Sequence, residues 1–271
     1  MYKLAFSTLG CPDWDFETIV KQAKTLGYSA IELRGIKDEL RIDALPIFIN
    51  GKYKETNKLL ADNDLCICNV GTSVFFHNPE GYETALTEGK TAIDMCHTVG
   101  IPAIRVFGDA VPPGEPIEAV NERIIKGIRE LCDYSEEKTN GTVQIWLEVH
   151  GDFNSPKMLT PITNELTDQT CFGMLWDIQH SFTAGIPPIE FYNEFKSIIR
   201  HIHVKDCIYE NGKPIEKLPG DGVIPIKEHC EILEKGGYKG YYSLEWEKRW
   251  HPDLPDPEIA FPMYANLMNT F

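Results

Sequence analysis

Four short segments of the chain carry aliphatic residues on one parity and polar residues on the other. These segments are 144–150, 174–177, 201–205 and 241–247. Successive side chains of a strand point to opposite faces, so each segment would have an apolar face and a face that turns polar at its C-terminal end. Strands buried under helices normally read as continuous aliphatic sequence, so the polar parity needs an enclosed polar space. The mouth of a parallel barrel supplies such a space.

An internal repeat supports this architecture. Residues 26–33, 99–106 and 235–242 each run from a helix end through a glycine and a short connection into a strand-like segment. Glycine suits the left-handed residue that ends a helix, and the connection then feeds the next strand. The repeat therefore predicts the helix-to-strand joint of a recurring βα unit.

Eight strands and the amphipathic stretches between them can be placed from these joints. The predicted strands are 3–7, 30–34, 65–70, 103–108, 143–149, 172–177, 200–205 and 241–246. Helical spacing of apolar residues marks 16–26, 82–99, 117–135 and 226–235. Alternating strands and helices indicate a parallel sheet, and eight strands indicate an α/β fold of the (β/α)8 TIM barrel type. A doubly wound sheet is the alternative, but residues 7–10 contain one glycine rather than a Gly-rich dinucleotide loop.

Length and charge narrow the class of protein. The chain has 271 residues, 42% of them hydrophobic, so it can bury a full core, and we expect one domain over residues 1–271. The net charge of -15 and the isoelectric point near 5.0 argue against a nucleic-acid partner, because phosphate binding relies on clustered lysine and arginine. A small neutral or modestly anionic substrate fits better, and a homo-oligomer is compatible with the sequence.

Targeting and cysteine patterns favour a cytoplasmic protein. Residues 1–7 are too short an apolar run for a signal peptide, and no stretch reaches the apolar length of a membrane span, so no membrane partner is expected. The eight cysteines show no CxxC pair and no disulfide-like density. Cys66 and Cys68 share a parity, but buried small hydrophobic side chains are the favoured interpretation.

The polar parity ends in a donor set for a metal ion, formed by Glu148, Asp177, His203 and Glu245. Oxygen-rich sites with one imidazole favour Mn²⁺, Mg²⁺ or Co²⁺, and Zn²⁺ is also compatible. Three carboxylates brought together without a cation would raise at least one pKa by like-charge repulsion. The alternative is that each acid is an ordinary strand-end residue, solvated or paired with a nearby loop. Glu247 has the parity of Glu245, and we choose Glu245 as the ligand because it lies deeper in the strand.

Several further side chains are candidates for substrate binding. His180 follows Asp177 by three residues and would share its pocket if the strand turns into a helix there, although a surface histidine is an equal alternative. Lys205 has the parity of His203 and would place an ammonium at the mouth. Its alternative role is an ion pair with Asp206 or Glu247.

Two more candidates are less specific. Arg105 points inward by parity, as do Glu32 and Arg34, for which an ion pair is the favoured interpretation. Trp14 lies in a loop and would supply an apolar wall for a sugar, but loop aromatics as often pack against their own loop. The proline-rich segments 111–116 and 251–257 are predicted to be loops on the same side.

Motifs in the second half of the chain identify a family resemblance. They are Trp-Leu-Glu-Val-His-Gly-Asp-Phe at 146–153, Trp-Asp-Ile-Gln-His at 176–180, His-Ile-His-Val-Lys-Asp at 201–206, Pro-Gly-Asp-Gly at 219–222 and Ser-Leu-Glu-Trp-Glu at 243–247. In this order they resemble the sugar phosphate isomerase/epimerase family of the xylose isomerase-like TIM barrel superfamily. The resemblance covers essentially the whole chain and is strongest over residues 144–252.

The resemblance implies a metal-dependent isomerase or epimerase of carbohydrate metabolism. By it, Glu148, Asp177, His203 and Glu245 bind one divalent metal ion, and His180 contacts the substrate, a small sugar, ketose, inosose or sugar phosphate. The metal would stabilise an enediolate, with Glu148 and Glu245 as the catalytic acid and base. A lyase or dehydratase acting on a keto sugar or 3-keto-glycoside is one alternative, and a non-catalytic sugar-binding barrel is another.

The same superfamily contains a three-zinc endonuclease group, from which this chain departs. That group's pattern needs an Asp-x-His pair soon after the seventh strand, and residues 206–210 and the loop that follows lack it. His77 and His97 do not replace the missing ligands. Together with the negative charge, this departure argues against action on DNA.

Overall fold

The computed structural model describes residues 2–271. Eight parallel strands close into a barrel in the order β1-β10-β7-β6-β5-β4-β3-β2, which confirms the predicted TIM barrel. The barrel strands are β1 Leu4–Ser7, β2 Ala30–Leu33, β3 Cys66–Phe75, β4 Ala103–Phe107, β5 Gln144–Glu148, β6 Phe172–Asp177, β7 Ile199–Val204 and β10 Tyr242–Leu244. The helices are α1 Phe16–Thr25, α2 Tyr53–Asp62, α3 Tyr82–Val99, α4 Ile117–Thr139, α5 Pro156–Asn164, α6 Ile178–Thr183, α7 Pro188–Phe195, α8 Ile226–Lys235 and α9 Pro257–Asn269. All eight predicted strands are present: β6 has the predicted bounds, β3 runs on to Phe75, and the ends of the other six differ by one or two residues.

A β-hairpin that the sequence analysis did not predict follows β7. Strands β8 Asp206–Glu210 and β9 Lys213–Lys217 pair antiparallel, with Ile208 opposite Ile215. Their turn is Asn211-Gly212, and both residues have positive φ, 51° and 77°. An Asn-Gly pair with two positive φ angles is the preferred two-residue hairpin turn, so the sequence did carry a local marker for it.

The predicted helix-to-strand joints are present. Gly27, Gly100 and Gly237 have φ of 78°, 89° and 81°, the left-handed region that favours glycine. Gly100 is itself the C-cap of α3, and its backbone N–H bonds the carbonyl of Cys96. The glycine therefore ends each helix and turns the chain into the next strand.

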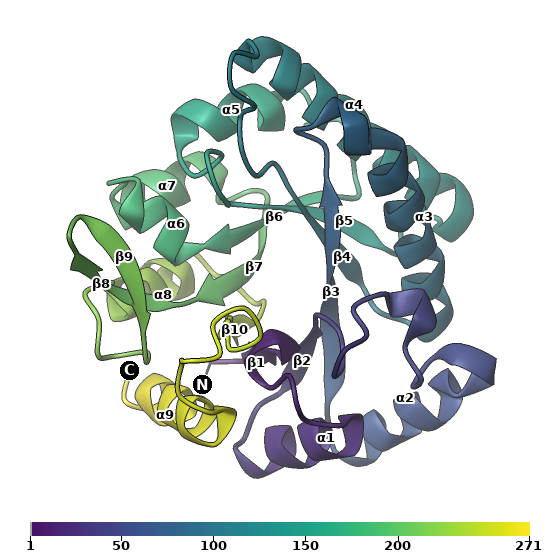
Figure 1. Ribbon diagram of the computed structural model, residues 1–271, viewed down its shortest axis with the longest axis vertical. Helices are drawn as coiled ribbons and strands as arrows, with labels where there is room; N and C mark the ends of the chain where they lie inside the picture. Colours follow the sequence, from purple (N-terminus) through teal and green to yellow (C-terminus); the bar gives the residue numbers. More distant parts are fainter. Residues whose placement is uncertain (1) are drawn as a thin grey trace. The chain divides into compact units, whose positions relative to one another are not determined.

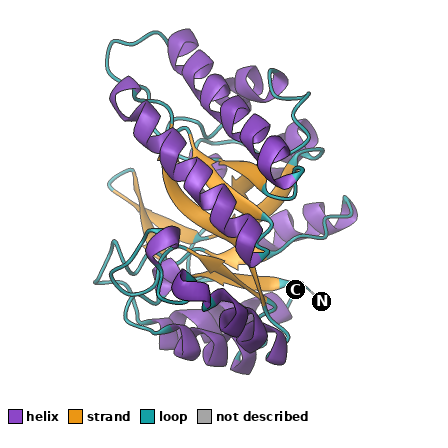
Figure 2. Ribbon diagram, turned by 90° about the vertical axis from the view of Figure 1, so that its right-hand side faces the viewer, coloured by secondary structure: helices purple, strands orange, loops and turns teal. Residues whose placement is uncertain are grey.

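The chain divides into two compact units, Met1–Asn69 with His201–Phe271, and Val70–Arg200. In the first unit, β1 pairs with β2 and β10, and β10 pairs with β7. Helix α1 begins at its N-cap Asp15, whose carboxylate accepts the N–H of Thr18. Its buried side chains recur at helical spacing, as expected for a helix that packs one face on strands: they are Phe16, Ile19, Val20 and Ala23. Figure 2 shows helices packed against strands.

In the second unit, β4 lies between β3 and β5, and β5 pairs with β6. The two longest helices, α3 and α4, lie side by side along its outer surface (Figure 1). The central strands are buried along almost their whole length, which explains their aliphatic character.

Two further observations concern the chain as described. Among residues 2–271, no helix combines the length and apolarity needed to cross a membrane. The eight cysteines are free thiols, and all of them except Cys66 are buried.

Candidate active site

Strand β7 and the segment after β10 hold two of the candidate metal ligands in the first unit. Ser243 is in register with His203, and the N–H of Glu245 bonds the carbonyl of Val204 at 3.2 Å. This pairing places Nδ1 of His203 3.0 Å from Oε2 of Glu245. Both side chains are buried, so an imidazole nitrogen and a carboxylate oxygen face each other away from water.

A third buried residue of this unit, Glu32 on β2, holds the other side of the imidazole. Its carboxylate lies 2.9 Å from Nε2 of His203 and 2.9 Å from Nε2 of His201. A carboxylate accepts only, so each histidine donates from Nε2. For His203, this leaves Nδ1 facing Glu245, as in carboxylate–histidine–metal arrangements.

The two imidazoles keep Glu32 ionised. Burial by itself raises the pKa of a carboxyl group, but the charge of His203 and the hydrogen bonds from both histidines outweigh it and lower the pKa of Glu32 well below its usual value. The sequence favoured an ion pair of Glu32 with Arg34 and did not predict the contact with the histidines. Strand parity places them all inward, but which strands face one another across a barrel depends on the closed sheet.

Lys205 neutralises part of this negative charge. Its Nζ lies 2.6 Å from Oε2 of Glu245 and 2.8 Å from Oε1 of Glu247. The predicted ion pair with Glu247 is therefore present. Of the two glutamates, Glu245 is the more deeply buried, as its position in the strand predicted: its side chain is 5% exposed, against 25% for Glu247. The role of Lys205 in substrate binding stays a prediction.

The unpredicted hairpin brings another acid to this cluster. Glu216 on β9 accepts the backbone N–H of Glu247 at 3.4 Å. Burial raises its pKa to about 8, with Lys205 opposing the shift and Glu247 adding to it. Glu216 is therefore largely protonated at neutral pH, and it can donate a hydrogen bond.

Asp206 fixes the loop that follows the hairpin. Its carboxylate accepts backbone N–H groups from Cys207, Gly220, Gly222 and Ile224 at 2.9 to 3.1 Å. These bonds account for the Pro-Gly-Asp-Gly segment as a tight loop, and the ion pairs of Lys205 are with Glu245 and Glu247.

The second unit holds the other two candidate ligands at the ends of adjacent strands. Glu148 ends β5 and Asp177 ends β6, and in the ladder Glu148 is in register with Leu175. Both carboxylates are buried. Nε of Arg105 lies 3.1 Å from Oε2 of Glu148, and its guanidinium lies over the ring of Phe107 at 4.9 Å. Arg105 thus points inward as predicted and supports Glu148, while its contact with substrate stays a prediction.

Asp177 also starts a helix. Its Oδ1 accepts the N–H of Gln179 at 2.8 Å and that of His180 at 3.3 Å, so Asp177 is the N-cap of α6. The strand turns directly into a helix here, and Nε2 of His180 comes to 3.9 Å from Oδ2 of Asp177. His180 is therefore beside the candidate ligand, as the spacing of three residues predicted.

Trp14 is packed against its own unit. Its Nε1 donates to Oε1 of Glu258 at 3.3 Å, and its ring meets that of Phe261 edge-on at 5.6 Å. Both partners belong to α9. Packing against α9 therefore accounts for the burial of Trp14. Its role as an apolar wall for a sugar stays a prediction.

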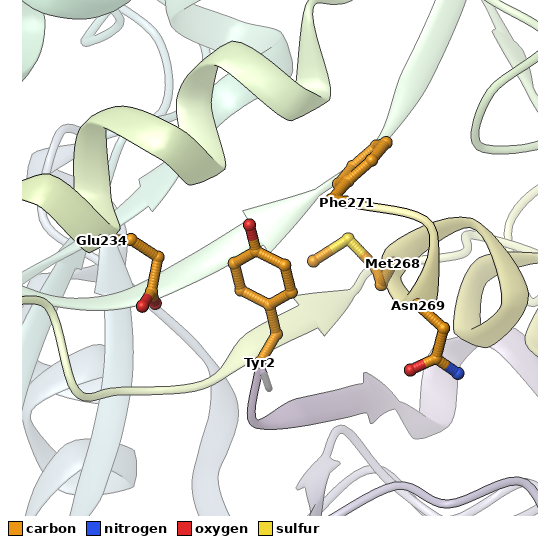
Figure 3. Close-up of a pocket in the computed structure, with 5 residues that line it drawn as sticks. All are labelled: Tyr2, Glu234, Met268, Asn269 and Phe271. Carbon is orange, nitrogen blue, oxygen red and sulfur yellow. The ribbon is translucent and has the colours of Figure 1, made fainter.

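The first unit also contains a cavity of about 330 Å³, shown in Figure 3. It is lined by Tyr2, Glu234, Met268, Asn269 and Phe271. Tyr2 precedes β1, whereas Glu245 follows β10, which is parallel to β1. The cavity therefore lies at the opposite strand ends from His203 and Glu245 and is not part of the candidate active site.

The family model of the xylose isomerase-like TIM barrel matches residues 20–261. The chain belongs to this family. Among curated relatives, the inosose dehydratase of Geobacillus thermodenitrificans is 27% identical to this chain over 157 residues. The aligned region covers 51% of this chain and 49% of the relative. The chain thus spans about half the length of the curated relatives it matches.

Solved structures share the fold over its full length. The IolI protein with a bound zinc atom has a TM-score of 0.80 at 18% identity, with 98% of this chain and 97% of that chain covered. The 3-keto-D-glucoside 4-epimerase YcjR of E. coli has a TM-score of 0.77 at 15% identity, with 100% of both chains covered. At these identities the likeness extends to the fold alone.

Each unit of this xylose isomerase-like barrel holds buried donors of the kind that bind divalent metal ions. They are His203 and Glu245 in the first unit and Glu148 and Asp177 in the second. Oxygen-rich donor sets of this kind suit hard or borderline divalent cations.

Proposed function

We propose that this protein is a divalent-metal-dependent isomerase or epimerase of a small keto sugar or inosose, with Glu148, Asp177, His203 and Glu245 as the metal ligands. The observation that carries the proposal is the contact of His203 with Glu245 at 3.0 Å, with Glu32 on the far side of the imidazole. An imidazole nitrogen and a carboxylate oxygen at this separation can bind the same cation.

Charge supports the same conclusion in each unit. In the first unit, Glu245 is buried and paired with Lys205, and Glu247 shares that ammonium. In the second, Glu148 and Asp177 are buried with Arg105 paired to Glu148. Buried carboxylates need compensating charge, and a dication supplies it.

The metal ion would supply Lewis-acid stabilisation of negative charge that develops on the substrate oxygens. The chain's own groups would move the protons. Glu148, oriented by Arg105, and Glu245, oriented by Lys205, act as base and acid toward a C–H next to the ketone. Return of the proton to the same carbon from the other side gives an epimer, and return to the neighbouring carbon gives an isomer. His180 would bind a substrate oxygen beside Asp177.

The chemistry of the proposed ligands limits which metal ions would bind. Three carboxylates favour Mn²⁺, Mg²⁺ or Co²⁺, with manganese our first choice. The zinc in the IolI structure supports Zn²⁺ as a further option for this chain.

A dehydratase is the second candidate function, favoured by the inosose dehydratases among the relatives. The same removal of a proton next to a ketone can be followed by loss of a β-hydroxyl group, with Glu245 or the protonated Glu216 as the acid. Elimination gives a product that absorbs in the ultraviolet, whereas isomerisation and epimerisation do not.

Solvent deuterium exchange tests the function directly. The metal-loaded protein in D2O should place deuterium on the reacting carbon of a ketohexose, an inosose or a 3-keto-glycoside. Glu148→Gln should slow this exchange by about 10²-fold or more, because it removes a general base. Glu165→Gln, an exposed glutamate of the same unit, is the matched control and should exchange at the normal rate.

Metal analysis of both variants separates loss of the base from loss of the ion. Binding of these compounds without any exchange in the metal-loaded protein would indicate a sugar-binding barrel and reject the enzymatic proposal.

A further inference from the structure

A row of polar side chains follows the carboxyl ends of β3 to β6 in the second unit. We call His77, Asp109, His150 and His180 the polar rim. Oδ1 of Asp109 lies 3.2 Å from Nδ1 of His150, and Oδ2 lies 3.9 Å from Nε2 of His77. The rings of His150 and His180 are 4.6 Å apart between centroids. The polar rim thus extends from His77 to His180, which neighbours the candidate ligand Asp177.

Unlike the candidate ligands, the polar rim is open to water. The side chains of His77, Asp109, His150 and His180 are 12%, 36%, 33% and 22% exposed. Glu148 and Asp177, in the same unit, are 2% and 0% exposed. A small molecule arriving from solvent would therefore meet the rim while its reacting end reaches the buried ligands.

The backbone holds Asp109 in an unusual conformation. Its φ is 63°, a left-handed value, and its carbonyl accepts the N–H of Asp152 at 2.8 Å. The Asp152 carboxylate in turn accepts the N–H of Val111 at 2.8 Å. A Cβ on Gly151 would lie 2.4 Å from the Asp109 carbonyl oxygen, so the two loops meet backbone to backbone. Such over-determined left-handed residues cluster at functional sites, where they fix a side chain in advance.

The charge of Asp109 determines which ligands it can accept. The neighbouring His150 lowers the pKa of Asp109, so the side chain is a carboxylate at neutral pH. A carboxylate accepts hydrogen bonds from hydroxyl groups and repels a phosphate dianion. The guanidinium of Arg105, the nearby cation of β4, is already engaged by Glu148.

We propose that Asp109, positioned by His150 and His77, binds hydroxyl groups at the non-reacting end of the substrate and selects an unphosphorylated polyhydroxy ketone over its phosphate ester. This inference rests on the proposed function for the identity of the reacting end. It assigns Asp109 and the two histidines a role in specificity, and it narrows the substrate class to neutral ketoses and cyclic polyol ketones.

Equilibrium binding to the manganese-loaded full chain tests this proposal. Calorimetry should compare ketopentoses and ketohexoses with their terminal phosphates, and should include an inosose. The unphosphorylated compounds should bind at least about tenfold more tightly than their phosphates. Asp109→Asn should weaken their binding by about tenfold, the usual effect of a hydrogen bond to a charged group, and should not weaken binding of the phosphates.

Asp64→Asn is the matched control. Asp64 also has a left-handed φ, 56°, but it precedes β3 rather than following β4. This variant should bind every compound as the unchanged protein does. Where turnover is measurable, Asp109→Asn should raise KM and leave kcat within about threefold, because it changes binding that is equal in the ground and transition states.

Three results would overturn the inference: tighter binding of the phosphates, equal affinities in Asp109→Asn and the unchanged protein, or no binding of any compound. Its failure is distinguishable from failure of the proposed function. If ketoses bind in an Asp109-dependent way but exchange no deuterium, the enolisation fails and this inference stands. If exchange occurs with an unchanged KM in Asp109→Asn, the reverse holds.

Discussion

The polar side chains of the two units differ in their access to water. In the first unit, Glu32, His201, His203 and Lys205 are sealed in the interior, and each contacts an oppositely charged or hydrogen-bonding partner. In the second, the polar rim, whose side chains are partly exposed, lies beside the buried Glu148 and Asp177. The comparison indicates a division of labour: the first unit fixes a ligand in position, and the second also presents groups to an incoming molecule.

The cations of the two units provide the strongest test of this comparison. Lys205→Met leaves Glu245 and Glu247 without their shared ammonium, and Arg105→Met removes the cation paired to Glu148. Without metal, each should lower the free energy of unfolding by about 3 kcal/mol or more, with Lys205 the larger loss, because a buried carboxylate loses its counter-charge. Urea denaturation with a chelator present measures the effect.

A surface pair gives the control for this test. Lys235→Met removes the exposed partner of Glu231 and should cost less than about 0.5 kcal/mol. Added Mn²⁺ should recover part of the stability lost in Lys205→Met, because the ion then supplies the missing charge. Equal losses in all three variants would contradict the electrostatic interpretation of the two units.

Glu32 tests whether the sealed groups of the first unit act on the metal ion. Glu32→Gln replaces a carboxylate that accepts from both histidines with an amide that fixes their tautomers less well. Metal affinity should fall by about 10- to 100-fold, the typical effect of losing the outer partner of a ligating histidine. Competition with a fluorescent chelator measures it without reference to turnover.

The exposed glutamate Glu55 on α2 is a suitable control, since Glu55→Gln should leave metal affinity unchanged. An unchanged affinity in Glu32→Gln would show that Glu32 serves the fold alone.

The smallest expected effect concerns Glu216 and the pH dependence of the free energy of unfolding. Its pKa in the folded protein is about 8, against 4.5 for an ordinary glutamate. The folded state therefore holds its proton more tightly than the unfolded state, so this group's contribution to stability is lost as the pH rises from about 4.5 to about 8. Glu216→Gln should become more stable relative to the unchanged protein over this window, by about 1 kcal/mol after allowance for solvent screening.

Thermal unfolding of the metal-free protein at pH 5 and at pH 8.5 measures this difference. Asp221→Asn, in the loop after the hairpin, is a control that should show no such trend. A difference between Glu216→Gln and the unchanged protein that shrinks with rising pH would mean that the side chain is ionised when folded.

Much of the fold could be predicted from local patterns. The barrel strands follow from parity and from the glycine joints, because both depend on neighbours along the chain. The hairpin of residues 206–217 was missed although Asn211-Gly212 marks its turn. Its strands are short, and β9 and the end of β8 are largely exposed, so they lack the apolar face on which the prediction relied.

The candidate ligands were predicted by type and strand position, and the structure shows each of them buried. Their joint binding of a metal ion stays a prediction. The single domain over residues 1–271, the cytoplasmic location, a homo-oligomer and a sugar substrate also stay predictions. Glu32, Glu216 and Asp109 were not predicted as site residues, because their roles come from contacts with residues remote in the sequence or from a hairpin that was not foreseen.

The sequence by itself determined the alternation of strands and helices, the inward parity of the acids and histidines, and membership of a barrel family. Only the tertiary structure decided which of these groups meet: Glu32 with His201 and His203, Lys205 with Glu245 and Glu247, and Asp109 with His150. The physical reason is that side-chain parity is a property of each strand alone. Ion pairing and the resulting pKa shifts depend on distances across the sheet, which are fixed only when the strands have paired in register.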